Sequence, residues 1–597
     1  MAAVWVISTS GRPWELFARA GFSSDFYDEQ AQAFLRGRLD VDPRVAGPEG
    51  FLIGGKTYLY FGPMLAVVRL PFMLFGDLFV GRLVRVSMLV AMLVLGRWSN
   101  RLALLARARV GPTSPASWPR AAFVSAVLAS PAILAAGWIS VYNETELWAL
   151  ALSIVSITLM LELAAGNFTD RRRLLATAAA VLATTLTRAP IGLGIAFVLG
   201  LCGLFLVARS RRGHVDRVVA FGAVAAGAGP LIIHAAISRI KLGTLLGIPW
   251  ERQVLTLNSS VRAEFFERTG TGFFSHRFLP TTLAQYLRPD TIRFERLIPW
   301  IRYGPPAPDY ANFPVETTTP APSITASATL LLLLAVIGII WMLRNRCRMW
   351  ILVIAGTAIG TLPTFLIGFI ASRYVIDLLA PMVVAGSLGV WRLGDLNRQK
   401  YVGIGVAVLA VWGLWVNSSL AIWNIGYKTV GFTEARYGLD DALFGGGHES
   451  LITLDPGSAV PRDDIVAIAA DCSGVWIAEQ GRWVALDSPM GVRNASGTVT
   501  SDGVIAAGSI WQLSVVDVAT SPRAVFSVEG GEGFEQPLDL GSGDFSISVD
   551  AVQNFFFAQI GDTEFFLPGD IVGGDVDIRV DMTTPMPQSA LCQSLRD

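Results

Sequence analysis

Long apolar runs recur along the first 424 residues of the chain, separated by short polar connections. A helix needs about 20 predominantly apolar residues to cross a bilayer, and most of these runs approach that length. The runs are Leu78–Arg97, Ala121–Ile139, Leu147–Ala165, Leu174–Thr187, Ile191–Ala208, Val218–Ile237, Ala326–Leu343, Trp350–Ile370, Val375–Trp391 and Val402–Trp423. The pattern predicts a polytopic α-helical membrane protein with about 10–11 transmembrane helices in a domain spanning residues 1–424.

Basic residues cluster in alternate connections between these runs. The clusters are Arg97, Arg101, Arg107, Arg109 and Arg120; Arg171, Arg172 and Arg173; Arg209, Arg211 and Arg212; Arg344, Arg346 and Arg348; and Arg392, Arg398 and Lys400. Cytoplasmic connections of membrane proteins carry an excess of Lys and Arg. We therefore expect a multi-pass protein of the cell membrane, with residues 9–77, residues 241–325 and the chain after Trp423 on the extracytoplasmic side.

Two of the runs lie very close together. The run from Leu174 is short, and only Arg188-Ala189-Pro190 separates it from the next run. Either one kinked helix or a helical hairpin fits this spacing. The alternation of the basic clusters favours the hairpin.

Two apolar stretches near the N-terminus do not fit a simple crossing. Ala2–Ile7 is too short to span a bilayer and lacks the apolar core of a signal peptide, so we expect a truncated first helix. Phe61–Phe75 is broken by Pro63, Arg69 and Pro71. We expect this second stretch to be interfacial or re-entrant.

The pattern changes after about Gly474, where short β-rich runs alternate with Gly, Asp and Ser-Pro turn signals. The runs are Val475–Ile477, Trp511–Val518, Ala524–Val528, Phe545–Val549, Phe555–Ile560 and Ile578–Val580. They predict an extracytoplasmic β-sandwich over residues 474–597. Residues 425–473 are expected to be a linker or a mixed segment that leads into it.

Composition supports the membrane interpretation and excludes some functions. The chain is 52% hydrophobic and 16% charged, and its 47 basic residues balance its 47 acidic ones. This neutrality gives no reason to expect a nucleic-acid partner. None of the four cysteines is in a CxxC motif, which argues against a zinc site. Cys202 and Cys347 are expected to stay thiols, whereas Cys472 and Cys592 either form a disulfide or stay unpaired.

The most informative polar stretch follows the first apolar residues and concentrates Asp25, Asp28 and Glu29. A carboxylate at the extracytoplasmic mouth of a helical bundle can act as a general base on a hydroxyl group. A solvated, helix-capping acidic cluster is the competing interpretation.

Further polar groups are predicted on the same side of the membrane. In Gly55–Pro63 the side chains of Lys56, Tyr58 and Tyr60 share one face, and Arg69 follows within an apolar stretch. Cations near the interface can hold a lipid phosphate, while tyrosines can stack on sugar rings or anchor at the headgroups.

Two more charged groups lie at the ends of apolar runs. Glu144 and Glu146 add carboxylates to the connection that precedes Leu147. Arg373 and Asp377 begin a later run, where charges are costly unless they are used or paired. An Arg373–Asp377 ion pair at helical spacing is one interpretation, and a ligand site is the other.

These motifs together resemble the GT-C superfamily of membrane glycosyltransferases. The resemblance rests on Asp25 soon after the first helix, Ala33 to Gly37, the stretch Gly55–Pro63, and Arg373-Tyr374 followed by Asp377. It covers roughly the first 420 residues. The exported β-rich domain and the richness in Ala, Arg and Gly are similar to actinobacterial cell-wall enzymes, including arabinosyl- and mannosyltransferases.

The resemblance implies transfer of a sugar from a polyprenyl-phosphate donor to an envelope glycan or glycolipid. Asp25 would be the catalytic base, with Asp28 as the competing candidate. The donor phosphate would be bound by cations, and the sugars by acids and tyrosines. The implied donor ligands are Arg373, Arg188, Lys56 and Arg69, and the implied sugar contacts are Tyr58, Tyr60, Glu144 and Glu146.

No obligate metal or other cofactor is implied. Asp40-Val41-Asp42 has the form of a metal-binding DxD motif, but we expect an ordinary loop there.

A transporter or flippase of lipid-linked substrates is the main alternative. Such proteins place ionisable groups near the bilayer midplane. Here the centres of the apolar runs are nearly free of charge, and the acids gather at the predicted exported mouth. The pattern therefore favours the transferase.

Overall fold

The computed structural model describes most of the first 428 residues. The described ranges are 2–20, 23–112, 117–210, 216–258, 260–270, 272–294, 298–308, 310, 313, 315–318, 320–395 and 399–428, then 439, 442–443 and the strands between Leu451 and Asp581.

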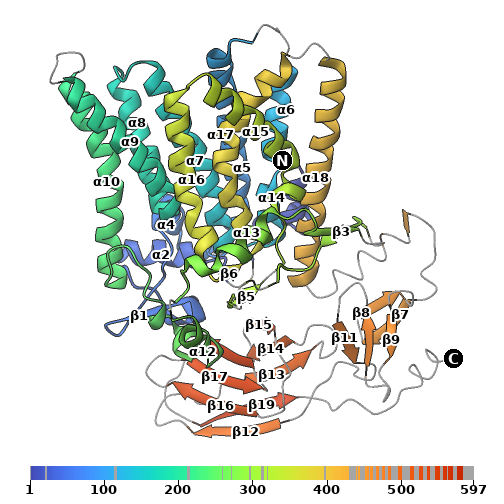
Figure 1. The fold of residues 1–597 in the computed structure, drawn as a ribbon. Helices are drawn as coiled ribbons and strands as arrows, with labels where there is room; N and C mark the ends of the chain where they lie inside the picture. The colour runs from blue at the N-terminus through green and yellow to red at the C-terminus, as the bar shows by residue number, and fades with distance from the viewer. Residues whose placement is uncertain are drawn as a thin grey trace.

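All ten predicted apolar runs contain a long helix, and these helices lie side by side (Figure 1). They are α5 (Val84–Val110), α6 (Trp118–Leu128) with the 3₁₀ helix η4 (Pro131–Gly137), α7 (Val141–Ala165), α8 (Arg171–Thr187), α9 (Ala189–Ser210), α10 (Arg217–Leu242), α15 (Thr329–Arg344), α16 (Arg348–Leu366), η8 (Ser372–Leu378) with α17 (Leu379–Gly394), and α18 (Gln399–Lys428). In the described part of the chain, eight helical segments are long and apolar enough to cross a membrane. The predicted polytopic helical fold is confirmed.

The helices approach one another closely through small residues. A methyl group added at Gly338 of α15 would lie 1.8 Å from the carbonyl oxygen of Ala385 in α17, and one at Gly389 would lie 1.9 Å from that of Leu334. Only glycine allows this contact, which is a typical way of packing helices that lack a hydrophobic driving force within lipid.

The predicted hairpin between Leu174 and Ala208 is also confirmed. Helix α8 ends at Thr187, Arg188 is extended, and α9 begins at Ala189. A methyl group added at Gly192 would lie 2.3 Å from the Cα atom of Thr185, so the two helices turn back on each other. The side chain of Arg188 therefore lies at a sharp turn between two apolar helices.

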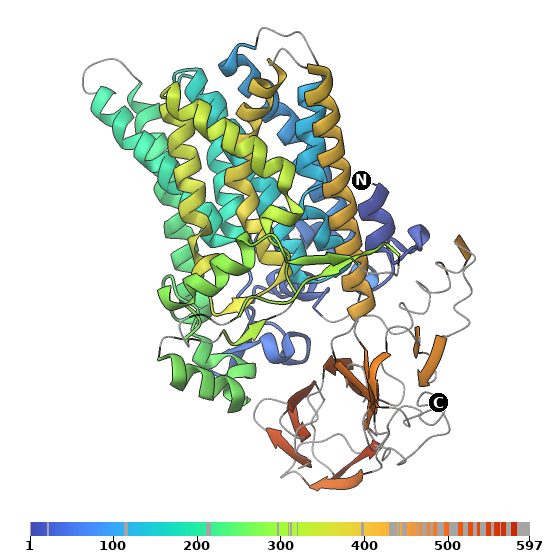
Figure 2. The same cartoon turned by 45° about the vertical axis from the view of Figure 1, so that its right-hand side comes forward.

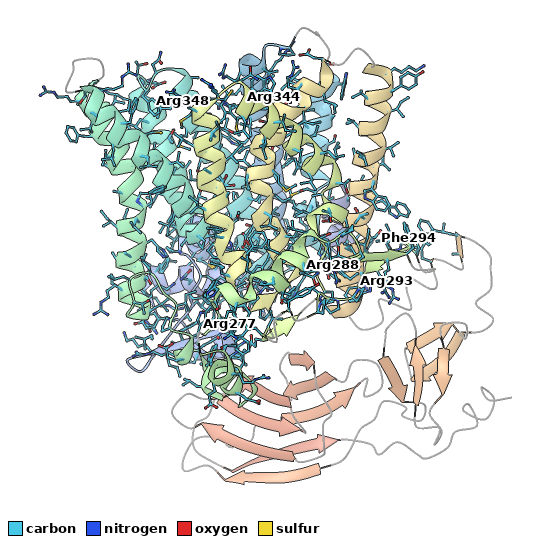
Figure 3. The ribbon with its side chains drawn as sticks, viewed as in Figure 1. Arg277, Arg288, Arg293, Phe294, Arg344 and Arg348 are labelled. Atoms are coloured by element: carbon cyan, nitrogen blue, oxygen red, sulfur yellow. The ribbon has the colours of Figure 1, made fainter. Side chains whose placement is uncertain are left out.

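The two ends of the helical bundle differ in their connections. We call the end that carries residues 9–77 and 241–325 the loop face, and the opposite end, with the basic clusters of Arg344 and Arg348, the arginine face. Figure 3 labels Arg344 and Arg348 at one end and Arg277 at the other. The separation of the two ends agrees with the predicted alternation of connections.

Short elements cover the loop face. Those before α5 are α1 (Ala2–Ser8), η1 (Pro13–Glu15), α2 (Phe26–Leu35), α3 (Pro43–Ala46), η2 (Gly47–Glu49), β1 (Phe51–Ile53), β2 (Lys56–Tyr58), α4 (Met64–Met73) and η3 (Gly76–Phe79). Helix α1 lies beside α18 and α5 (Figure 2). Helix α4 occupies the stretch that we expected to be interfacial or re-entrant, and its ten residues are too few for a full crossing.

The second group of short elements lies between α10 and α15 in the sequence, except for β6, which follows α16. It comprises η5 (Trp250–Arg252), α11 (Val254–Asn258), α12 (Ser260–Thr269), η6 (His276–Phe278), α13 (Leu279–Leu287), β3 (Ile292–Phe294), β4 (Ile301–Tyr303), β5 (Thr317–Thr318) and α14 (Ile324–Ser327), and β5 pairs with β6 (Phe369–Ile370). The backbone N–H of Val254 donates to the carbonyl oxygen of Gly50 at 2.8 Å. The two groups of short elements are thus joined directly.

All six predicted β-runs contain a strand. The strands are β7 (Leu451–Asp455), β8 (Ser458–Pro461), β9 (Ile465–Ile468), β10 (Gly474–Ile477), β11 (Arg482–Ala485), β12 (Ala495–Thr500), β13 (Trp511–Val516), β14 (Arg523–Val528), β15 (Phe534–Pro537), β16 (Phe545–Asp550), β17 (Phe555–Ile560), β18 (Thr563–Pro568) and β19 (Asp575–Asp581). Strand β9 pairs with β10, so pairing begins before Gly474, and the largest sheet has the order β12-β19-β13-β14-β15. Face-to-face packing as a sandwich stays a prediction.

The expected free thiols at Cys202 and Cys347 are confirmed, and both are buried. Cys472 and Cys592, the expected disulfide or unpaired thiols, lie outside the described residues.

Candidate functional site

A cavity of about 910 Å³ opens among the helices near the loop face. Its helical wall comes from α7, the turn between α8 and α9, α10, α16 and η8, and its cover comes from residues 246–251 and 272–274. Apolar side chains such as Leu193, Ile237 and Pro363 alternate with a small number of charged groups. Binding sites for amphipathic molecules have this composition.

Arg188 organises one side of the cavity. Its Nε and Nη2 atoms donate to the two carboxylate oxygens of Asp377 at 2.8 and 2.5 Å, and its Nη1 atom lies 2.8 Å from Oε1 of Glu146. The hydroxyl of Thr364 donates to the same Asp377 carboxylate at 2.8 Å. The second Glu146 oxygen has no hydrogen-bond donor among the described residues.

The Arg373–Asp377 ion pair, one of the two interpretations of these residues, does not form among the described residues. Both residues lie in η8, a 3₁₀ helix, where side chains four positions apart do not share a face as they do in an α-helix. The Asp377 carboxylate instead pairs with Arg188. The interpretation of Arg373 and Asp377 as a local pair is therefore wrong.

Arg373 lines the cavity with its guanidinium surrounded by aromatic rings. The guanidinium carbon lies 4.7 Å from the ring centre of Tyr142, 4.9 Å from that of Tyr374 and 5.6 Å from that of Phe369. No carboxylate among the described residues forms an ion pair with Arg373. Its positive charge is stabilised by rings and stays available to an anion.

Lys241 brings a second cation to the same cavity from the last turn of α10. The side chain is buried, and its ammonium donates to the carbonyl oxygen of Phe61 at 3.0 Å. No carboxylate pairs with it in the described part of the chain. A buried ammonium bonded only to a carbonyl is costly, so an anionic ligand would stabilise it.

His234 and Ser238 line the cavity from the same side of α10 as Lys241. They extend the polar wall by about two helical turns toward the centre of the bundle. A ligand bound at Lys241 would therefore meet hydrogen-bonding groups along this helix as well.

A separate ion-pair cluster lies outside the lining of the large cavity. Arg69 donates from Nη2 to both oxygens of Glu144 at 2.8 Å, and its Nη1 atom lies 3.2 Å from Oδ1 of Asp28. All three side chains are at most 4% exposed. Two carboxylates contact the single guanidinium, so Arg69 and Glu144 are engaged with each other rather than with the cavity.

Asp28 is held on both sides. Its second oxygen accepts a hydrogen bond from the backbone N–H of Gly81 at 2.8 Å. Burial raises the pKa of Asp28 to about 6, although the charge of Arg69 acts in the opposite direction. The side chain thus links α2, α4 and the segment that leads into α5.

Asp25 precedes α2 and is only half-buried. It borders Gly81, where an added methyl group would lie 4.0 Å from the Asp25 Cβ atom and 3.7 Å from Cγ of Arg19. Two residues along, the Tyr27 hydroxyl lies 2.6 Å from that of Thr145, which lines the large cavity. Asp25 does not itself line the large cavity.

Lys56, Tyr58 and Tyr60, which were predicted to share one face, lie in different environments. Tyr60 lines the large cavity and stacks on Phe61 with ring centres 4.2 Å apart, whereas Tyr58 does not line it. Lys56 is exposed and lies 3.5 Å from Oδ1 of Asp40. Arg38 also donates to Asp40, and this hydrogen bond lowers the pKa of that carboxyl group.

The Asp40-Val41-Asp42 stretch lies in a loop, as expected. No group of three or more His, Cys, Asp or Glu side chains suited to a metal ion occurs among the described residues.

Sequence reasoning missed two residues of this region. The sequence pattern puts Lys241 at the start of an exported loop, but in the structure it is buried in the last turn of an apolar helix. Glu29 was placed in an acidic cluster without a role of its own. Burial and the neighbouring Asp25 and Asp42 raise the pKa of Glu29 to about 7. That perturbation depends on tertiary packing, which no sequence pattern reveals.

Comparison with known proteins gives only weak structural similarity. No protein-family model and no curated protein matches the chain. The archaeal oligosaccharyltransferase AglB from Archaeoglobus fulgidus, solved with an inhibitory peptide and a dolichol-phosphate, matches with a TM-score of 0.40 and 13% identity, over 71% of this chain and 55% of its own. ArnT from Cupriavidus metallidurans, bound to undecaprenyl phosphate, matches with a TM-score of 0.35 and 14% identity, over 74% and 76%. The chain therefore spans about half the length of the oligosaccharyltransferase that it matches, and neither similarity is strong enough to transfer a substrate or a residue role.

Proposed function

We propose that the chain is a membrane glycosyltransferase that moves a sugar from a polyprenyl-phosphate donor to a glycan or glycolipid of the cell envelope. The observation that carries the proposal is the large cavity, where apolar walls of membrane helices meet Arg373 and Lys241. A lipid-linked phosphate needs both kinds of surface. The reaction takes place at the loop face, which we assign to the extracytoplasmic side from the arrangement of basic connections.

The two cations bind the donor phosphate. As the bond between the anomeric carbon and the phosphate oxygen breaks, negative charge grows on the departing polyprenyl phosphate. A guanidinium and an ammonium held in a largely apolar cavity stabilise that charge more strongly than they would in water. Arg188 assists by orienting Glu146 and Asp377, since its own charge is shared between them.

Glu146 and Tyr60 contact the sugar. Glu146 offers one carboxylate oxygen that has no donor among the described residues, and Tyr60 offers a ring on the cavity wall. A carboxylate oxygen suits a sugar hydroxyl, and an aromatic face suits the C–H face of a sugar ring.

Asp25 is the catalytic base. It removes the proton from an acceptor hydroxyl while that oxygen attacks the anomeric carbon, and polyprenyl phosphate leaves with the electron pair of the broken bond. Asp25 precedes α2 and is half-buried, whereas Asp28 is buried against Arg69. We assign Asp28, Arg69 and Glu144 to holding α2 and α4 in place.

The resemblance to actinobacterial arabinosyl- and mannosyltransferases suggests a pentosyl or hexosyl transfer in cell-wall assembly. The position of the charged groups favours a transferase over a transporter. Glu144 and Glu146 lie in the first two turns of α7, Lys241 in the last turn of α10, and Arg188 at a turn. These groups lie at helix ends near the loop face, where a reaction with an exported acceptor takes place.

Turnover of synthetic donors tests the proposal. The full chain is purified into lipid nanodiscs and supplied with polyprenyl-phosphate pentoses and hexoses together with envelope glycans. We expect release of free polyprenyl phosphate with at least one donor, and strong loss of this release in Arg373→Ala. In proteoliposomes, movement of intact lipid-linked sugar across the bilayer without release of polyprenyl phosphate would instead identify a flippase.

A further inference from the structure

A second, smaller cavity of about 480 Å³ lies beside α2 on the loop face. No residue lines both cavities. Its polar lining comes from the segment before α2, from α2 itself and from two later connections, and includes Arg19, Glu29, Gln32, Arg36, Asp42 and Asp77. The volume is in the usual range for small-molecule sites.

The chemistry of this lining differs from that of the large cavity. Guanidinium, carboxylate and carboxamide groups dominate the wall, and no aromatic side chain contributes to it. Such a wall offers many donors and acceptors of hydrogen bonds but no surface for a lipid chain or an aromatic ring. Carboxylates also outnumber guanidiniums, which disfavours a phosphate, and the described residues form no group suited to a metal ion. A neutral, polyhydroxylated ligand suits it best.

Glu29 is the group in this cavity that lacks a partner. In the described part of the chain its carboxylate makes no hydrogen bond or ion pair, although the side chain is half-buried. By contrast, Gln32 donates to Asp77 at 3.0 Å and accepts from Arg36 at 3.1 Å. A carboxylate on a cavity wall with no donor from the protein can accept a hydrogen bond from a ligand hydroxyl.

Helix α2 connects this cavity to the proposed reaction site. Glu29 and Gln32 face the small cavity, while Tyr27 on the same helix reaches Thr145 in the wall of the large one. Asp25 at the start of the helix and Arg19 in the wall of the small cavity both border Gly81. Asp25 lines neither cavity, but it adjoins Arg19 of the small one across Gly81, so a sugar bound there would lie near the proposed base.

We infer that the small cavity is the acceptor site, which binds the hydroxyl-bearing end of a glycan through Glu29 and Arg36. This inference rests on the proposed function, because an acceptor is needed only if the chain transfers sugars. The two cavities then divide the reaction, since the apolar one takes the lipid-linked donor and the polar one the sugar acceptor.

The test measures glycan binding apart from turnover. Methyl glycosides of galactose, mannose and arabinose are titrated against the full chain in nanodiscs, and binding is followed by saturation-transfer NMR. Loss of a hydrogen bond to a charged group corresponds to about tenfold in affinity. We expect Glu29→Leu and the exposed Arg36→Ala each to weaken binding of the preferred glycoside by about tenfold, with Glu29→Gln intermediate.

Glu264→Leu is the matched control, because Glu264 is an exposed acid of α12 that lines neither cavity. Unchanged glycoside affinity in both Glu29→Leu and Arg36→Ala would overturn the acceptor site, even if the wild-type chain consumes donor. Weakened binding in these variants supports the site. If the wild-type chain then consumes no polyprenyl-linked sugar, the transferase proposal fails while the glycan site stands.

Discussion

Arg188 and Asp377, separated by 189 residues in the sequence, are joined by two hydrogen bonds of 2.8 and 2.5 Å. The pair connects the turn between α8 and α9 to η8, directly before α17, on the wall of the large cavity. Glu146 of α7 completes the contact, so one guanidinium joins three helical segments. The geometry of the proposed donor site therefore depends on this arginine even if no substrate touches it.

Asp377→Ala should lower the free energy of unfolding by about 1.5–3 kcal/mol, because Arg188 and Thr364 lose their hydrogen bonds to a buried carboxylate while Arg188 keeps Glu146 as an opposite charge. Equilibrium unfolding in detergent, followed by tryptophan fluorescence, measures the change. Glu264→Ala breaks an exposed ion pair with Arg268 and should cost at most about 1 kcal/mol. Equal losses in the two variants would show that the buried pair is not structural.

Donor affinity should depend on both cations of the large cavity. Arg373→Ala and Lys241→Met are each expected to raise the KM for a polyprenyl-phosphate sugar by about tenfold, because each removes one charged contact to the phosphate. A contact that strengthens in the transition state would lower kcat as well. Steady-state kinetics with varied donor concentration separate the two effects.

Arg239→Ala is the control for Lys241. Arg239 lies on the same helix, is exposed and does not line the cavity. Its removal should leave the donor KM within about twofold of the wild type, since an exposed charge contributes little to a site it does not reach. A donor KM that responds equally to all three variants would indicate a general effect of surface charge.

The orientation of the chain is a third prediction. The connection between Arg97 and Arg120 should be cytoplasmic, and the chain after Trp423 extracytoplasmic, because the basic clusters occupy alternate connections. Reporter enzymes fused after Arg109 and after Asp597 test this. A reporter active only in the cytoplasm should work at Arg109, and one active only outside should work at Asp597.

The helical architecture was predictable because each crossing needs a long apolar run, and this requirement is local in the sequence. The hairpin at Arg188 was predictable too, because basic clusters in alternate connections indicate how often the chain crosses the membrane. The partners of the charged groups were not predictable. Asp377 lies four residues from Arg373, yet its partner is 189 residues away, and only the packing of α8, α9 and η8 brings the two together.

The candidate site was predictable in part. Arg373, Tyr60 and Glu146 lie in one cavity as the motifs implied, since they occur near apolar runs that end on the same face. Arg69 and Glu144 carry the same chemistry but neutralise each other. Sequence shows where a charge occurs, whereas the number of opposite charges within reach depends on the fold.

The pH dependence of stability offers a fourth prediction. Burial, Asp25 and Asp42 raise the pKa of Glu29 to about 7, against the smaller effect of Arg36, and its usual value is 4.5. A folded-state pKa above the unfolded one favours the protonated form, so this contribution is complete below about pH 4.5 and is lost as the pH rises toward 7. Glu29→Gln should therefore narrow the difference in melting temperature between pH 5 and pH 8.

Asp28 acts in the same direction, because burial raises its pKa to about 6. Glu29→Gln should therefore remove only part of the difference in melting temperature between pH 5 and pH 8. Glu264→Gln, which changes an exposed acid, should leave the difference as it is in the wild type. A difference unaffected by Glu29→Gln would show that Glu29 titrates as it does in the unfolded chain.

A final experiment should distinguish the roles of Asp25, which precedes α2, and Asp28, which lies within it. Asp25→Asn should lower glycosyl transfer by about 10²–10⁴-fold with little change in melting temperature, because asparagine keeps the size of the side chain but cannot accept the proton. Asp28→Asn should instead lower the melting temperature, because asparagine loses the charged contact that joins Asp28 of α2 to the buried Arg69 of α4. Initial rates with a saturating donor, measured beside thermal unfolding of the same preparations, distinguish loss of chemistry from loss of structure.

A stable but inactive Asp28→Asn variant beside an active Asp25→Asn variant would move the base to Asp28. Full transfer in both variants would show that neither Asp25 nor Asp28 is the base. Glu146 in the large cavity would then be the next acid to replace.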